Sequence, residues 1–142
     1  MTGLGPNALD FWIGDWTVSW PGGHGRNTIS RILDGQVIEE VFESHGEDGS
    51  LPGRSHSVLD TADGRWRQTW VDSSGSYLDF VGIEVAGRIS FQRSHLLDGA
   101  TVWQRMVWLD VSAESFRWQW QRSTDHGATW SLVWPLDYRR NR

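Results

Sequence analysis

The sequence contains no cysteine, which excludes disulfide bridges and metal sites built from thiolates. In a chain of 142 residues without disulfides there is little to favour secretion, so we expect a cytoplasmic protein. No stretch is apolar over enough residues to span a bilayer, and the N-terminus lacks the basic start and apolar run of a signal peptide. We therefore expect no membrane partner.

Basic charge and motifs for cofactors are also scarce. Thirteen Lys and Arg stand against 18 Asp and Glu, which gives a formal charge of -5, so we expect no nucleic-acid partner. The five histidines are scattered, with no H-x-H or H-E-x-x-H spacing, which predicts no metal site. No glycine-rich phosphate loop is present, and we expect no cofactor.

Tryptophan, in contrast, is abundant, with 11 residues in the chain. Most of them fall on alternate positions of short apolar runs, as in Trp66-x-Gln68-x-Trp70 and Trp118-x-Trp120. Residues two apart in a β-strand point to the same face. That face is expected to be buried or to enclose a ligand.

Short runs separated by glycine-containing turns predict an all-β fold. The runs are Asp15–Trp20, Gly25–Leu33, Val37–His45, Arg54–Asp60, Arg65–Asp72, Ser76–Glu84, Arg88–His95, Thr101–Asp110, Ser115–Ser123 and Thr129–Tyr138. About ten antiparallel strands in sequence order indicate an up-and-down meander, and closing it into a barrel removes both exposed edges. We predict one domain over residues 1–142, a roughly ten-stranded barrel with a short helical turn at Pro6–Trp12.

Turn lengths predict which residues face the barrel interior. A two-residue turn at Ser112-Ala113 would place Trp103 and Arg105 on the inner face with Trp118 and Trp120. The other turns add further residues to the same interior. The expected ligand-binding set is Trp66, Gln68, Trp70, Phe80, Phe91, Arg93, His95, Trp103, Arg105, Trp118 and Trp120.

Gly14-Asp15-Trp16, at the beginning of the first strand, is a G-x-W motif. It resembles the first motif of the lipocalin and wider calycin barrels. The resemblance implies that Trp16 closes one end of the barrel and is covered by an arginine near the chain end, here Arg139 or Arg140.

Residues 123–130 match the Asp-box pattern S-x-D-x-G-x-T-W. In this pattern the aspartate accepts hydrogen bonds from backbone amides of a hairpin turn, and the tryptophan packs beneath it. The pattern is best known from sialidase propellers, where it recurs in each blade. A single copy in a chain of this length predicts a β-hairpin rather than glycosidase activity.

Several segments together resemble a bacterial family of small lipocalin-like proteins, known mostly as domains of unknown function. They are Phe11–Trp16, Gly64–Asp72, Tyr77–Phe80 and the stretch from the Asp-box to Arg140. The resemblance implies a barrel and brings no established activity and no catalytic residues.

Polar residues among the predicted inner positions supply the chemistry. Glu40 shares a face with Ile38 and Phe42, and a loop centred near Asp48 would set it opposite His56. Such groups could form a buried network that fixes the barrel register with water, or they could orient a ligand.

We therefore hold several functional hypotheses open. The first is binding of a small hydrophobic or aromatic molecule with an anionic or carbonyl end, gripped by an arginine. The second is a cofactor-independent isomerase, cyclase or lyase with Glu40 or His56 as the acid–base group. The third is carbohydrate binding through surface tryptophans such as Trp20 and Trp108. An outer face with Tyr77, Val81 and Ile83 also suggests a homodimer.

Overall fold

The predicted all-β barrel is confirmed by a computed structural model, which describes residues 4–46 and 52–142. A 3-10 turn, η1 (Asp10–Trp12), precedes ten antiparallel strands. The strands are β1 (Gly14–Trp20), β2 (Gly23–Ile32), β3 (Val37–Gly46), β4 (Gly53–Leu59), β5 (Trp66–Asp72), β6 (Tyr77–Val85), β7 (Arg88–Leu97), β8 (Ala100–Leu109), β9 (Ser115–Ser123) and β10 (Ser131–Arg140).

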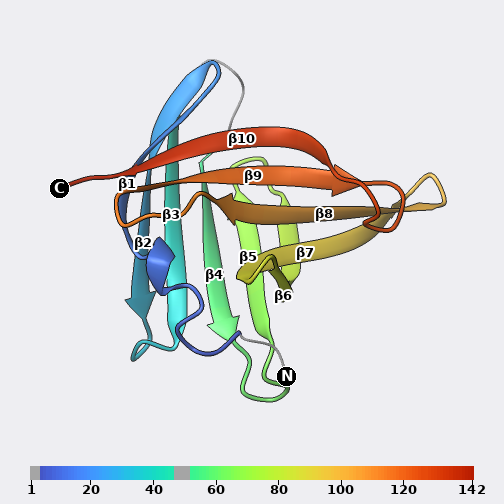
Figure 1. Ribbon diagram of the computed structural model, residues 1–142, viewed down its shortest axis with the longest axis horizontal. Coiled ribbons are helices and arrows are strands. Elements are labelled where there is room, and N and C mark those ends of the chain that lie inside the picture. The colour runs from blue at the N-terminus through green and yellow to red at the C-terminus, as the bar shows by residue number, and fades with distance from the viewer. Residues whose placement is uncertain (1–3, 47–51) are drawn as a thin grey trace.

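Each strand pairs with its neighbours in sequence, and β1 also pairs with β10, so the sheet closes on itself. Figure 1 shows β8, β9 and β10 crossing one side of the barrel while β2 to β5 form the other. The β7–β8 hairpin and the β9–β10 loop extend together beyond the barrel wall (Figure 1). Among the described residues no helix has the length and hydropathy needed to cross a bilayer.

Two of the predicted hairpin turns show why these sequences reverse the chain. Val85 pairs with Arg88, so Ala86-Gly87 is a two-residue turn, and both of its residues have positive φ (51° and 81°). Asp98-Gly99 makes the same turn between β7 and β8, with φ of 52° and 81°. This conformation matches the twist of paired strands and favours glycine and aspartate.

The turn between β8 and β9 differs from the prediction. Leu109 pairs with Arg117, and not with Phe116, because the connection is longer than the two residues Ser112-Ala113. The Ser112 hydroxyl accepts hydrogen bonds from the amides of Glu114 and Ser115 and so stabilises the longer loop. A shift of one residue in register exchanges the two faces of a strand, so the inward side of β8 is reversed relative to the prediction.

Trp16, for which the resemblance implies a closing role at one end of the barrel, is fully buried beside η1. Its indole Nε1 donates a hydrogen bond to the Trp12 carbonyl oxygen at 2.8 Å, and the Arg140 guanidinium lies 4.2 Å from its ring centroid. Arg140 also donates to the carbonyl oxygens of Ile13 and Ala113. Arg140, and not Arg139, is therefore the arginine that covers Trp16. Its hydrogen bonds link the end of β10 to Ile13 and to the loop between β8 and β9.

The turn around Asp125 joins β9 to β10. The Asp125 carboxylate accepts hydrogen bonds from the amide and hydroxyl of Thr129, and from the Ser123 hydroxyl. These hydrogen bonds lower the pKa of Asp125 from its usual 3.8 to about 2. Trp130 lies against Gly127 on the outside of the hairpin. The segment thus forms the hairpin that the sequence predicted.

Candidate functional site

The barrel encloses a cavity of about 590 Å³. Its wall is formed by Trp12, Glu40, Phe42, Gln68, Trp70, Asp72, Leu78, Phe80, Gln104, Met106, Trp118, Trp120, Val133, Trp134, Leu136 and Tyr138. Trp12, whose carbonyl oxygen accepts the hydrogen bond from the Trp16 indole, lies at one end of the cavity. Asp72 at the end of β5 and Val133 near the beginning of β10 lie at the other end, where Val133 is 52% exposed. The cavity therefore opens to solvent at the end away from η1.

The aromatic side chains of the wall hold one another in place. The rings of Trp118 and Trp120 are nearly parallel, 6° apart in plane, with centroids 6.5 Å apart. Trp134 meets Trp118 edge-on at 6.3 Å, and Phe80 meets Trp120 edge-on at 5.7 Å. Edge-to-face contacts at these distances are favourable and restrict ring rotation. The wall is thus a preformed aromatic surface.

A polar cluster interrupts this wall at Glu40. The side-chain amide of Asn27 donates to Glu40 Oε2 at 2.7 Å, and the Ser55 hydroxyl donates to Oε1 at 2.6 Å. Burial raises the pKa of Glu40, and the two hydrogen bonds oppose this effect without cancelling it. Glu40 is therefore a desolvated carboxyl group with a fixed orientation in the cavity wall.

Tyr138 extends the cluster toward β10. Asn27 donates from the same amide nitrogen to the Tyr138 hydroxyl at 2.8 Å, so one amide joins the phenol and the carboxyl group. Burial, with the nearby charge of Glu40, raises the pKa of Tyr138 well above its usual range. The phenol is therefore neutral at physiological pH and can donate a hydrogen bond to a bound molecule.

Two more polar side chains line the cavity. Gln68 is buried and donates from its amide to the Ser57 hydroxyl at 2.9 Å. Asp72 accepts hydrogen bonds from the Trp70 indole and from Ser74 at the open end. Burial acts to raise the pKa of Asp72, but these hydrogen bonds outweigh it and lower the pKa below the usual value. Asp72 is thus a negative charge at the cavity mouth.

Six of the predicted site residues line the cavity: Glu40, Gln68, Trp70, Phe80, Trp118 and Trp120. Trp66 and Phe91 are buried beneath it, where they contribute to the core without lining the cavity. The Trp66 indole is engaged with the carbonyl oxygen of Gly5 at 3.0 Å.

Arg93 and His95 continue along β7 past the cavity. Both lie on the same face of the strand as Phe91, as expected, but neither lines the cavity. Arg93 Nη1 donates to Gln104 Oε1 at 2.6 Å and lies 3.3 Å from His95 Nδ1. Gln104 lines the cavity, so Arg93 contacts a cavity-lining residue without lining the cavity itself.

The inward placement of Trp103 and Arg105 is wrong. The register of β8 directs Gln104, Met106 and Trp108 inward and turns the intervening residues to the outer face. There Arg105 lies 4.0 Å from the Trp130 ring centroid and donates to Gln121 Oε1. The longer β8–β9 turn is the cause of this difference.

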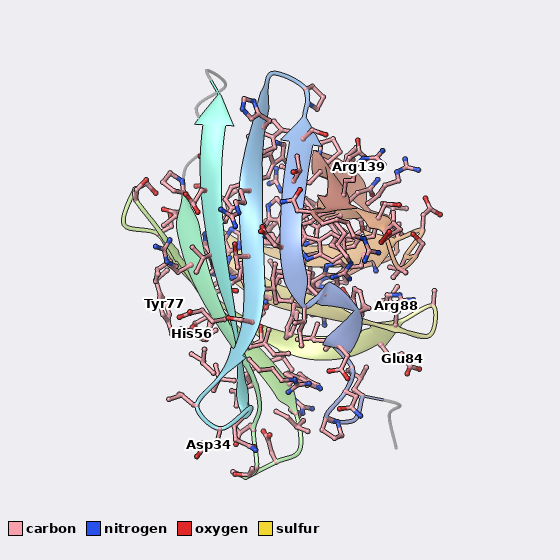
Figure 2. The ribbon with its side chains drawn as sticks, turned by 90° about the vertical axis from the view of Figure 1, so that its left-hand side faces the viewer. Asp34, His56, Tyr77, Glu84, Arg88 and Arg139 are labelled. Carbon is pink, nitrogen blue, oxygen red and sulfur yellow. The ribbon has the colours of Figure 1, made fainter. Side chains whose placement is uncertain are left out.

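The placement of His56 beside Glu40 is also wrong. The predicted loop centre, Asp48, lies outside the described residues, and the pairing of β3 with β4 sets Glu40 opposite Ser55. His56 instead faces outward, 54% exposed, where its Nε2 lies 3.0 Å from Glu39 Oε2. Figure 2 shows His56 on the outside of the barrel. The structure therefore leaves Glu40 as the acid–base candidate of the cavity.

The main residues that sequence reasoning missed are Asn27 and Tyr138. The alternation Trp134-x-Leu136-x-Tyr138 was a usable signal, because all three line the cavity. The register of β10 is shifted by an irregularity between Leu132 and Trp134, which obscured their partners on β9. Asn27 carried no signal apart from its place two residues before Ile29, which is also buried.

None of the 11 tryptophans, all of which lie among the described residues, is fully exposed. Trp20 and Trp108, the two considered for sugar stacking, are 6% and 4% exposed. Within residues 4–46 and 52–142 no three His, Asp or Glu side chains gather to hold a metal ion. The aromatic cavity with the Glu40 carboxyl group in its wall is therefore the candidate site.

No family model matches the sequence, and no curated protein is significantly similar to it.

Proposed function

We propose that the barrel cavity binds a small hydrophobic or aromatic molecule. The observation that carries this proposal is a hollow of about 590 Å³, walled by indole rings and open at one end. Volumes of this size suit small organic ligands, and aromatic walls with a few polar groups are typical of their sites. Because the rings hold one another in place, little ordering of the wall would oppose binding.

The polar groups of the cavity would orient the ligand. The Tyr138 hydroxyl can donate to a carbonyl end, which supports that part of the sequence-based hypothesis. An anionic end has less support, since Arg105 lies outside the barrel and Arg93 is turned to Gln104. We therefore place the polar end of the ligand beside Glu40, Tyr138 and Gln68.

The proposal is tested with a neutral apolar probe, N-phenylnaphthylamine, whose fluorescence increases in apolar surroundings. Trp120→Ala removes a ring from the cavity wall, and Trp130→Ala removes one from the outer face, which makes the two variants a matched pair. We expect saturable binding to the parent protein, weakened about tenfold or more by Trp120→Ala and little by Trp130→Ala. Absence of saturable binding, or equal loss in both variants, would contradict the proposal.

A second candidate function is acid–base catalysis without a cofactor. It is favoured by the position of Glu40 in the cavity wall and by its raised pKa. A partly buried carboxyl group with a raised pKa, beside a neutral phenol, is suited to removing a proton next to a carbonyl group. The Glu40 carboxylate would take the proton from carbon, and the Tyr138 hydroxyl would donate to the oxygen that becomes negative. The proton would then return to the same or a conjugated carbon.

The catalytic candidate is tested with naphthyl methyl ketone in heavy water. NMR then measures exchange of the methyl protons for deuterium. We expect exchange above the buffer rate with the parent protein, loss of this excess in Glu40→Gln, and its retention in Glu39→Gln on the outer face. An excess rate that survives in Glu40→Gln, or none at all, would remove Glu40 as a base.

We also propose kinship with lipocalin-like barrels. The support is the pairing of Trp16 with Arg140 at the closed end, together with the order of the strands. A homodimer through the outer face of β6 remains a proposal, supported by the 64% exposure of Tyr77 on that face (Figure 2).

A further inference from the structure

Among the residues that the structure describes, the cavity is lined by acidic groups and by no basic ones. All 13 cationic residues of the chain are arginines, and every one of them belongs to the described residues. None of them lines the cavity, whereas Glu40 lines its wall and Asp72 its mouth. An anion entering this space would therefore meet carboxyl groups without a compensating cation, and a cation would meet a complementary field.

Glu40 is positioned to accept further hydrogen bonds. Each of its oxygens accepts one bond from the protein, Oε2 from Asn27 and Oε1 from Ser55. An ionised carboxylate has about four acceptor positions, so about two remain for a ligand. Gln68 adds its carbonyl oxygen, because its amide nitrogen is engaged with Ser57. The polar region of the cavity thus calls for a donor-rich ligand group.

The aromatic wall of the same cavity also favours positive charge. Trp118 pairs across the sheet with Leu136, which lies two residues from Tyr138. The Trp120 ring is nearly parallel to the Trp118 ring, and Trp134 meets Trp118 edge-on. Indole faces attract ammonium groups, and the attraction is stronger where water is excluded. The same surfaces accommodate the apolar part of a ligand.

We infer that the cavity selects a small apolar or aromatic molecule carrying a protonated amine, with the ammonium group bound by the Glu40 carboxylate and by indole faces of the same cavity wall. This inference rests on the proposed binding function and names the chemical class of its ligand. An ammonium group supplies three hydrogen-bond donors, which match the acceptors of Glu40 and Gln68. It also replaces solvent as the partner of a carboxylate that burial otherwise disfavours.

The inference is tested by isothermal titration calorimetry with naphthylmethylamine, naphthylmethanol and naphthoate, all substituted at the same ring carbon. The three probes share the apolar body and differ in charge. We expect the amine to bind about tenfold or more tightly than the alcohol, and the naphthoate to bind most weakly. In Glu40→Gln we expect most of the preference for the amine over the alcohol to be lost, with the remainder due to the indole faces and Asp72.

Glu39→Gln is the matched control, because Glu39 is the next residue, faces outward and contacts His56. It should leave the preference for the amine unchanged, and circular dichroism verifies the fold of both variants. If the alcohol binds as tightly as the amine, or the naphthoate binds most tightly, the inference is overturned while the binding function stands. If none of the three binds, the binding function fails as well.

Discussion

Asn27 on β2 donates a hydrogen bond of 2.7 Å to Glu40 on β3, although the two residues are not opposite each other in the strand pairing. Strand pairing sets Glu40 opposite Ile29 and Asn27 opposite Phe42, so the contact is diagonal. Through its second bond, to Tyr138, the buried Asn27 amide connects β2, β3 and β10 where the barrel closes. The cavity's carboxyl group is therefore held by the residues that also hold the barrel together.

Asn27→Ala is accordingly expected to lower the free energy of unfolding by about 1–3 kcal/mol, because two buried oxygens lose their donor. Urea unfolding followed by tryptophan fluorescence measures this change. The control is Asn141→Ala at the exposed C-terminal end, where the expected change is within about 0.5 kcal/mol. A change in Asn27→Ala as small as that of the control would show that the cluster does not stabilise the fold.

Arg140→Ala should destabilise the closed end of the barrel. It removes a cation–π contact with Trp16 and two hydrogen bonds to carbonyl oxygens, which we expect to cost about 1–3 kcal/mol together. Arg139→Ala, at the adjacent and exposed position, is the control and should change thermal stability little. Equal melting temperatures for the two variants would argue against Arg140 as a structural cover.

Asp125 predicts an acid-dependent contribution to stability. Its pKa is lowered from 3.8 to about 2 in the folded protein, mainly by the Thr129 hydroxyl. A carboxyl group with a depressed pKa stabilises the fold fully above its unfolded pKa, and this contribution is lost as the pH falls toward the folded value. The stability difference between the parent protein and Asp125→Asn should thus be constant at neutral pH and shrink between 3.8 and about 2. Urea titrations across this range would contradict the assignment if the difference stayed constant.

Binding of the naphthyl amine should depend on pH through Glu40. Burial raises the pKa of this group, and a bound ammonium would lower it again, so binding releases a proton where free Glu40 is protonated. The groups that face Glu40 are Asn27, Ser55 and Tyr138, of which only Tyr138 titrates, and it stays neutral. Affinity should therefore rise with pH through the pKa of free Glu40 and level off above it. A pH-independent affinity, or the same slope in Glu40→Gln, would speak against this coupling.

The sequence predicted the strands well because the two signals that define them are local. Alternating tryptophans and short turns such as Asp98-Gly99 depend only on neighbouring residues. The strand limits from the structure accordingly differ from the predicted ones by a few residues at most. Closure followed from the number of strands and the cost of exposed edges.

The faces and partners were harder to predict, because they depend on loop lengths and on closure. The loop after Leu109 is longer than predicted, so Trp103 and Arg105 face outward. The pairing of β3 with β4 also differs by one residue from the prediction, so Ser55 and not His56 lies opposite Glu40. Glu40 itself was predicted correctly to face the interior, since Phe42 on the same face is buried. Tyr138 lies near Asn27 and Glu40 because β10 pairs with β1 when the barrel closes, and no local sequence pattern predicts this pairing.

If a small aromatic molecule occupies the hollow of the barrel, intermolecular NOEs will locate it there. The measurement uses naphthylmethanol bound to the isotope-labelled protein. We expect contacts from the naphthyl protons to side chains of Trp118, Trp120 and Leu136 inside the cavity. Contacts confined to outer residues such as Trp130 or Tyr77 would contradict it.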